Sequence, residues 1–314
     1  MAGGSGERFW PLSTEEKPKQ LLSLITGKSM IKETVERVLR IVDAKDIYVA
    51  TNEIQSKRIK SELNEIPEEN IIIEPMFKDT AAAIAYGSTI ISRDKANPVV
   101  AGLASDHIIS DVDNFIEMLK IAESEAHKGA IVTLGVNPSR PETGYGYIKL
   151  ENNTVGVPGK ALRFMEKPNY ETAEEYLENG SYVWNSGMFI FQYETMMREV
   201  KKYIPDHYKI INKMQSILNN SYGLELSVRV KPYFKEFEKI SIDFAIMEKS
   251  RIIKCIPVNF GWSDVGGYNS LEEIFGKDEN NNTIRNARYI FLDSKSNIII
   301  SEQPNRLITT IGVE

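Results

Sequence analysis

The sequence predicts an α/β fold: a mostly parallel sheet flanked by helices on both sides, followed by a short C-terminal β unit. Three observations support this. Short β-branched runs alternate with helical patterns through the first half, most of these runs are apolar throughout, and the character of the chain changes after about Asp278. Strand–helix alternation is typical of parallel sheets covered by helices, and continuous apolar runs indicate strands buried on both faces.

The first half of the chain contains four expected strands with helices between them. The strands are residues 47–51, 71–74, 99–104 and 131–136. Ser29 is a candidate N-cap for a helix whose apolar side chains, from Met30 to Val42, follow helical spacing. Thr80 is the candidate cap of a helix over 81–92, and Asp113 opens a helix that runs to about residue 128. Ligands of such sheets bind beyond the carboxyl ends of the strands, so motifs there carry most weight.

The second half mixes strands and helices before it becomes turn-rich. Strands are expected at 147–150, 162–164 and 183–192, and helices at 194–202 and 241–250. Thr172 and Glu175 form a capping box that predicts another short helix. After an asparagine-rich linker, short strands are expected at 289–292, 298–300 and 307–311. The chain is therefore expected to divide into a domain over 1–277 and a small β appendage over 283–314.

Composition excludes several classes of protein. The 314 residues are 42% hydrophobic and 26% charged, which is ordinary for a globular chain and unlike disordered or membrane proteins. A net charge of -6 argues against a nucleic-acid partner, whereas a local cluster of cations would suffice for a small anion. Cys255 is the one cysteine, so no internal disulfide is possible. No signal peptide is recognisable and no apolar run approaches ~18–20 residues, so the expected location is the cytoplasm, without membrane contact.

A glycine-rich loop near the start of the chain is a candidate phosphate-binding element. Glycines let backbone N–H groups approach an anion closely, and nearby Arg8 and Lys19 add positive charge. The loop is neither a Walker A motif nor a dinucleotide fingerprint, because Phe9 stands where the third glycine would be. By itself such a loop can be an ordinary turn. No strand precedes it, so the sequence is expected to be truncated upstream. The loop residues are Gly3, Gly4, Ser5 and Gly6.

The residues around this loop resemble a known signature. The string from Gly3 to Ser13, followed by Pro18-Lys19-Gln20, resembles the sugar-nucleotide pyrophosphorylases, and its Phe-Trp-Pro-Leu-Ser form is similar to their mannose-1-phosphate guanylyltransferase branch. Further motifs match in order along nearly the whole chain. They are Ser105-Asp106-His107, the run from Arg140 to Ile148, Glu166-Lys167-Pro168, the run from Trp184 to Phe189, Ile242-Asp243 with Met247-Glu248-Lys249, and the run from Trp262 to Gly266.

The resemblance implies a fold and a reaction. It implies a Rossmann-like catalytic domain followed by a partial left-handed β-helix-like tail, which is expected to be truncated and to support a possible homodimer. It also implies transfer of GMP from GTP to α-mannose 1-phosphate, which forms GDP-mannose and pyrophosphate by direct displacement, with Mg²⁺ as cofactor. The longest relatives carry an additional isomerase domain, for which this chain has no room.

The resemblance also implies roles for individual residues. Asp106 and Asp264 would hold Mg²⁺, which prefers carboxylates, phosphate oxygens and water. Arg8 and Lys19 would bind the triphosphate and offset charge on the departing pyrophosphate. The sugar phosphate would be bound by Gly144, Glu166, Lys167 and Asn185. Without that resemblance, each aspartate would be interpreted as a helix cap or turn residue, and Glu166-Lys167 would be interpreted as a solvated charged pair. His107 is expected to be structural, because no proton need be removed from an anionic phosphate.

The residues that would recognise the base are the least defined part of the site. Glu74, Asp79 and Thr80 lie where the family reads the nucleotide, but the family's usual Asn-Thr-Ala-Pro is replaced by Asp79-Thr80-Ala81-Ala82. A carboxylate at position 79 suits the N1–H and amino group of guanine, and it equally suits a helix cap. Two alternatives therefore stay open. One is a related enzyme that uses dTTP or UTP with glucose 1-phosphate. The other is a non-catalytic sensor, which would have little reason to keep Arg8, Lys19 and Lys167.

Overall fold

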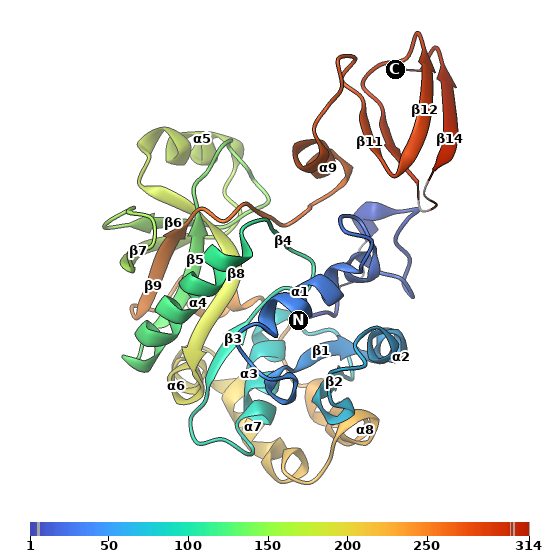
Figure 1. Cartoon of the computed structure of the whole chain (residues 1–314). Helices are drawn as coiled ribbons and strands as arrows, with labels where there is room; N and C mark the ends of the chain where they lie inside the picture. The colour runs from blue at the N-terminus through green and yellow to red at the C-terminus, as the bar shows by residue number, and fades with distance from the viewer. Residues whose placement is uncertain (5–6, 302, 304, 314) are drawn as a thin grey trace.

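The computed structural model describes residues 1–314 apart from 5–6, 302, 304 and 314 (Figure 1). Its centre is a six-stranded sheet with the order β3-β8-β5-β9-β7-β6. These strands are β3 (Val99–Gly102), β5 (Ile131–Val136), β6 (Tyr147–Leu150), β7 (Gly159–Met165), β8 (Tyr182–Gln192) and β9 (Ile253–Val258). The expected strands of this sheet are confirmed, and β9 is added to them.

The sheet is mixed, which corrects the expectation of a mostly parallel arrangement. β3, β5, β6 and β9 run in one direction, and β7 and β8 run in the other. Because β8 lies between β3 and β5, the pairings of β8 with both strands are antiparallel, and β5 with β9 is the parallel pairing among the described strands of this sheet. The α/β class is confirmed.

A second, two-stranded sheet lies beside the first. β1 (Val49–Asn52) pairs in parallel with β2 (Ile71–Glu74), with Val49 opposite Ile71. Ala2 N–H donates to the carbonyl of Ala50, and Ser105 N–H donates to the carbonyl of Met1. The first residues of the chain therefore connect β1 to the segment that follows β3.

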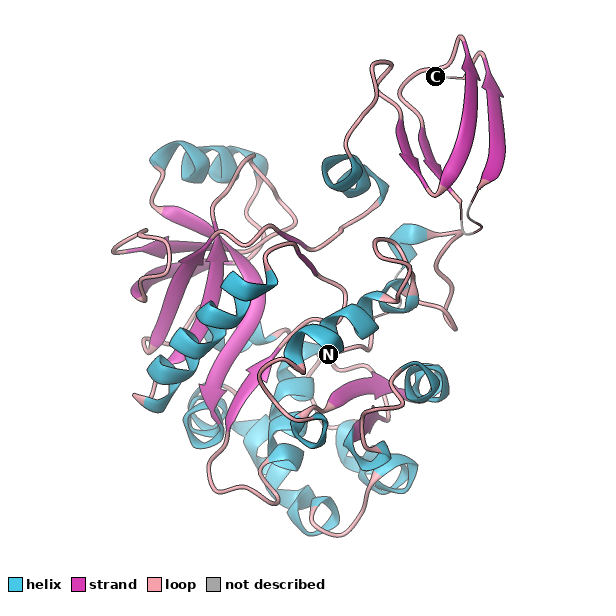
Figure 2. Ribbon diagram, viewed as in Figure 1, coloured by secondary structure: helices cyan, strands magenta, loops and turns pink. Residues whose placement is uncertain are grey.

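Helices cover both faces of the central sheet (Figure 2). The helices of the described residues are α1 (Met30–Val38), α2 (Glu53–Glu62), α3 (Asp79–Ile91), α4 (Val112–His127), α5 (Tyr170–Asn179), α6 (Tyr193–Tyr203), α7 (Pro205–Leu218), α8 (Gly223–Phe234) and α9 (Tyr268–Phe275); α2 lies beside β1 and β2, and α9 beside the C-terminal strands. Phe115 and Leu119 of α4 pack with Val132 of β5 in one core cluster. On the other face, residues of α3, α6, α7 and α8 pack with Ile131 and Phe191. Alternate residues of β5 thus face opposite cores.

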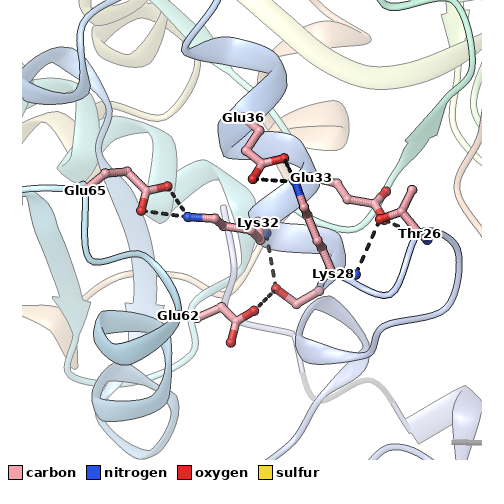
Figure 3. Close-up of polar contacts among 8 residues, drawn as sticks. Thr26, Lys28, Lys32, Glu33, Glu36, Glu62 and Glu65 are labelled. Carbon is pink, nitrogen blue, oxygen red and sulfur yellow. Dashed lines mark hydrogen bonds and ion pairs between the residues drawn. The ribbon is translucent and has the colours of Figure 1, made fainter. Parts of the chain in front are cut away.

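The start of α1 shows how polar side chains fix a helix end. Ser29 Oγ accepts from the N–H of Lys32, which confirms the predicted N-cap. The same hydroxyl donates to Glu62 Oε1 at 2.6 Å, and Lys32 Nζ lies 2.7 Å from Glu65 Oε1 (Figure 3). These contacts tie the beginning of α1 to the end of α2. Lys28 forms a separate ion pair with Glu36 on the surface.

Two predicted helix starts are wrong by up to three residues. The capping box at Thr172 does not form, because Asn169 is the N-cap and accepts from Thr172 N–H. The helix expected to open at Asp113 begins at Val112, with Asp111 as its N-cap.

Two further helix predictions need correction. Thr80 does not cap α3, which begins at Asp79; the carboxylate of Asp79 accepts from Thr80 N–H, and the Thr80 hydroxyl accepts from Ile242 N–H. Over 241–250 the regular element is one π-helical turn, Asp243–Met247, in which Glu248 N–H donates to the carbonyl of Asp243.

The C-terminal strands form a unit that projects from the rest of the molecule (Figure 1). β11 (Thr283–Arg285) pairs in parallel with β13 (Ile298–Ile300), and β12 (Ala287–Leu292) pairs in parallel with β14 (Arg306–Ile311). The three predicted tail strands are confirmed. Among the described residues, no helix is both long and apolar enough to cross a membrane.

Candidate active site

A short strand pairing brings together the two aspartates predicted to hold a metal. β4 (Ile108–Ile109) follows Asp106 closely, and β10 (Trp262–Ser263) ends immediately before Asp264. The two strands are antiparallel, with Ser263 opposite Ile108. Residues more than 150 positions apart in sequence therefore lie side by side beyond the end of β3.

Lys19 lies between these aspartates. Its Nζ is 2.9 Å from Asp106 Oδ2 and donates to the backbone carbonyl of Asp264. The lysine side chain is only 12% exposed. Burial by itself would raise the pKa of Asp106, but the positive charges around it, Lys19 foremost and with it His107 and the N-terminal ammonium, together hold the pKa below its usual range. The site thus combines an ionised carboxylate with a mostly buried cation.

The glycine-rich loop and Arg8 border this ion pair. Gln20 Nε2 donates to the carbonyl of Ala2, and Gln55 Nε2 donates to the carbonyl of Gly4. An added Cβ on Gly3 or Gly4 would meet no heavy atom within 4 Å, so the space beside both is open. Ser5 and Gly6 lie outside the described residues.

Arg8 reaches the segment that carries Asp264. Arg8 Nη1 lies 3.5 Å from the carbonyl oxygen of Gly266. A Cβ built on Gly266 would stand 3.4 Å from Asp264 Oδ2 and 3.6 Å from Arg8 Nη1. Arg8, Lys19, Asp106 and Asp264 are therefore gathered in one place, and their catalytic roles stay a prediction.

Tyr145 connects this cluster to the predicted sugar-binding residues. Its hydroxyl donates to Asp264 Oδ1 at 2.5 Å, and its backbone carbonyl accepts from Lys167 N–H. The ring packs edge-on against Trp184 and Trp262, with centroids 5.2 and 5.3 Å away. Trp262 Nε1 in turn donates to His107 Nδ1, which agrees with a structural role for that histidine.

The predicted sugar-binding residues lie close to one another. Glu166 Oε1 is 3.3 Å from Lys167 Nζ, whereas Glu166 Oε2 is buried and has no hydrogen-bond partner among the described residues. A Cβ on Gly146 would lie 2.5 Å from that oxygen and 3.4 Å from Asn185 Cβ, so a larger residue there would displace the Glu166 carboxylate. The N–H of Gly144 donates a hydrogen bond to Glu142 Oε1, so in this structure it is not available to a ligand.

Asp243 joins this group from the π-helical turn. Its Oδ1 accepts from Asn185 Nδ2 at 3.0 Å. Burial, reinforced by the Glu166 carboxylate, raises the pKa of Asp243 to about 7. Burial likewise raises the pKa of Glu166. Two acidic side chains are thus held near one another at the cost of folding stability.

Replacing Asp243 with asparagine should change how stability depends on pH. The carboxyl loses its proton near pH 4 in the unfolded chain but only near about pH 7 in the folded one, so it destabilises the fold increasingly across that interval. We expect the urea concentration at the unfolding midpoint to increase for Asp243→Asn relative to wild type as the pH rises from about 4.5 to about 7. Asp206→Asn is the control, since a surface lysine lowers the pKa of Asp206 and the trend should not appear. An equal difference at both pH values would contradict the expectation.

The residues predicted to recognise the base lie at the start of α3 and the end of β2. Asp79 has a left-handed backbone with φ of 67°, and its carboxylate accepts from the adjacent Thr80 N–H at 2.8 Å. Lys78 occupies the N-cap position of α3 and makes no side-chain cap hydrogen bond, so neither of the two expected roles of Asp79 is established. The Thr80 hydroxyl accepts a hydrogen bond from the N–H of Ile242. Burial raises the pKa of Glu74 to about 7. The assignment of these three residues to base recognition stays a prediction.

No group of three or more His, Cys, Asp or Glu side chains suited to a metal is found within the described part of the chain. Mg²⁺ does not need one, because it is commonly held by one or two carboxylates together with substrate phosphates and water. The carboxylates of Asp106 and Asp264, adjoining an open loop, fit such a site.

Comparisons with known proteins define the family. The model of the nucleotidyl transferase family matches residues 1–281. The chain therefore belongs to the nucleotidyl transferase family, to which the sugar-nucleotide pyrophosphorylase signature pointed.

Among the proteins similar to this chain are three whose names refer to mannose phosphates. A mannose-1-phosphate guanylyltransferase of Klebsiella pneumoniae is 36% identical over all of this chain, which spans 66% of the length of that relative. A Thermus thermophilus structure described as a mannose-1-phosphate geranyltransferase has a TM-score of 0.88 and 32% identity, covering 100% of this chain and 88% of that one. A Helicobacter pylori structure described as a mannose-6-phosphate isomerase has a TM-score of 0.66 and 30% identity, covering 79% of this chain and 95% of that one.

Several residues of this region were not singled out by the sequence. Tyr145 lies in the Gly144–Gly146 segment and Asp243 in a matched motif, but neither residue type at those positions signals its contacts. Gln20 follows Lys19 in the Pro-Lys-Gln string and anchors the glycine loop. Its position beside Lys19, a residue predicted to bind phosphate, is the available signal for such a role.

Proposed function

We propose that this chain catalyses the transfer of GMP from GTP to α-mannose 1-phosphate, with release of pyrophosphate. The observation that carries the proposal is the convergence of Lys19, Asp106 and Asp264 beside an open glycine loop, linked through Tyr145 to the Glu166–Lys167 pair. A cation and two carboxylates beside an anion-binding loop suit phosphoryl chemistry. Polar side chains next to this cluster suit a sugar phosphate.

The reaction is a direct displacement without a covalent enzyme intermediate. A phosphate oxygen of mannose 1-phosphate forms a bond to the α-phosphorus of GTP. The bond from the α-phosphorus to the bridging oxygen of the β-phosphate breaks, and its electron pair leaves with pyrophosphate. No proton transfer is needed, since the nucleophile is already anionic. Arg8 and Lys19 bind the triphosphate and stabilise charge on the departing group.

Asp106 and Asp264 would hold Mg²⁺, as their oxygen donors and their position beside the loop allow. When bound, the ion neutralises phosphate charge and orients the triphosphate. Tyr145 donates to the carboxylate of Asp264 and so fixes its orientation, the kind of supporting contact that metal ligands commonly have.

The sugar phosphate would be bound on the other side of Tyr145. Lys167 is 58% exposed, so its ammonium can reach the phosphate of the sugar. Glu166 would contact sugar hydroxyls, Asn185 would lie beside them, and Gly144 would approach the sugar closely. The names of the Klebsiella and Thermus relatives support mannose 1-phosphate as this substrate.

Thermal unfolding in the presence of nucleotides tests the choice of GTP. A ligand that binds the folded state raises the melting temperature by mass action. We expect GTP with Mg²⁺ to raise it more than ATP, UTP or dTTP at equal concentration. A larger rise with UTP or dTTP would leave the proposed reaction type unchanged but would identify uracil or thymine as the base. The assignment of Glu74, Asp79 and Thr80 to guanine recognition would then be wrong.

The remaining features of the proposal concern the whole chain. Residues 1–277 would form the catalytic domain and 283–314 the β appendage, through which the chain would form a homodimer. No nucleic acid and no membrane would be involved, and the enzyme would act in the cytoplasm.

A further inference from the structure

Asn185 has little hydrogen-bonding capacity left for a substrate. Its Oδ1 accepts from the Thr133 hydroxyl at 3.0 Å and from the N–H of Gly187 at 3.2 Å. Its Nδ2 donates to Asp243 Oδ1 at 3.0 Å. The side-chain amide has two acceptor sites and two N–H donors, so these contacts occupy three of the four. Asn185 is also only 8% exposed.

Asp243, by contrast, retains acceptor capacity and access. A carboxylate offers about four lone-pair sites, and Asn185 occupies one of them. The residue is partly exposed, and it begins the π-helical turn Asp243–Met247. Such turns are rare and occur frequently at functional sites.

Glu166 extends this set of acceptors. Its Oε2 is buried without a partner among the described residues, and its carboxylate is close enough to Asp243 to raise the pKa of that residue. Buried acceptors without donors are costly, which makes a ligand that supplies O–H donors favourable there. A pyranose ring supplies several hydroxyls, which can donate to both carboxylates.

We propose that Asp243 is a specificity-determining residue that accepts a hydrogen bond from a hydroxyl of the bound sugar, and that Asn185 is the positioning residue that holds it. The inference rests on the proposed function, because it takes the sugar 1-phosphate as the ligand. It transfers to Asp243 a contact that the sequence assigned to Asn185.

Asp243→Asn separates this role from a structural one. The amide oxygen of the new side chain can still accept from Asn185 Nδ2, so the internal contact is kept. The second carboxylate oxygen is replaced by an N–H donor, which cannot accept from a sugar hydroxyl. Asp206→Asn is a matched control, because Asp206 lies on the surface of α7 and pairs with Lys209.

The experiment measures pyrophosphate release at about pH 8, where Asp243 is ionised in wild type. Asp243→Asn should raise the KM for mannose 1-phosphate about tenfold or more and leave the KM for GTP unchanged. Wild type should discriminate against one of the 2-, 3- and 4-deoxy analogues of mannose 1-phosphate, and the variant should lose that discrimination. Asp206→Asn should behave as wild type.

Unchanged discrimination against all three analogues, or an equal rise in both KM values, would overturn the inference. The wild-type arm tests the proposed function separately. If wild type releases no pyrophosphate with any sugar phosphate, the proposed function fails. Calorimetric titration of mannose 1-phosphate then decides about Asp243: weaker binding to Asp243→Asn than to wild type would support its contact with the sugar, and equal or undetectable binding would overturn it.

Discussion

Replacing Lys19 with alanine should lower kcat/KM for pyrophosphate release by about 10²–10³-fold. The Lys19 ammonium lies 2.9 Å from Asp106 Oδ2 and contacts the carbonyl of Asp264, so it stands where the triphosphate would meet the carboxylates. Its loss removes a fixed, mostly buried cation that needs no reorganisation as charge develops on the departing pyrophosphate. Steady-state kinetics with GTP and mannose 1-phosphate measure the effect.

A second lysine provides the control for this substitution. Lys28 pairs with Glu36 on the surface beside α1 and has no ion pair with either aspartate among the described residues (Figure 3). Lys28→Ala removes the same charge and should leave kcat/KM unchanged. Equal activities for Lys19→Ala and wild type would exclude Lys19 from the chemistry.

Replacing Asp264 with asparagine should also reduce turnover by about 10²–10³-fold, and should weaken the dependence on Mg²⁺. The carboxylate is oriented by the Tyr145 hydroxyl at 2.5 Å, and the substitution keeps its shape while removing its charge. Mg²⁺ prefers charged oxygen ligands, so the concentration needed for half-maximal activity should rise.

Binding of Mn²⁺ in place of Mg²⁺ gives a readout independent of turnover. Mn²⁺ titration followed by electron paramagnetic resonance should show weaker binding to Asp264→Asn than to wild type, and unaltered binding to Asp206→Asn. Full Mg²⁺-dependent turnover by Asp264→Asn would contradict the assignment of this residue to the metal.

Elements with regular apolar patterns were predictable from the sequence. β5 and β6 match their expected ranges because every or nearly every residue is apolar and buried. α7 is absent from the sequence predictions, although its buried residues Ile210, Met214 and Leu218 lie at helical spacing. α2 has no such signal, since Gln55 and Ser56 are buried beside Ile59. Its packing is decided by tertiary hydrogen bonds that a sequence does not display.

Strand direction and helix starts depended on information that local pattern lacks. A buried strand such as β8 reads the same whether it runs parallel or antiparallel to its neighbours, so the mixed sheet could not be distinguished from a parallel one. Near α5, Asn169 and Thr172 are both good caps, and local sequence alone does not decide between them.

Sequence motifs predicted which single residues belong to the candidate site. They did not predict the contacts between those residues. Lys19, Asp106 and Asp264 were expected from motifs, and the structure places them together. That Lys19 lies between the aspartates depends on the β4–β10 pairing, which involves two short strands with weak sequence signals. The Asn185–Asp243 bond joins residues 58 positions apart and reverses which of the two is available to a ligand.

Pyrophosphate release from each nucleoside triphosphate in the presence of mannose 1-phosphate, with and without Mg²⁺, tests the central claim most directly. The proposed function predicts release with GTP, only when both mannose 1-phosphate and the metal are present. Release with no triphosphate under any of these conditions would contradict it.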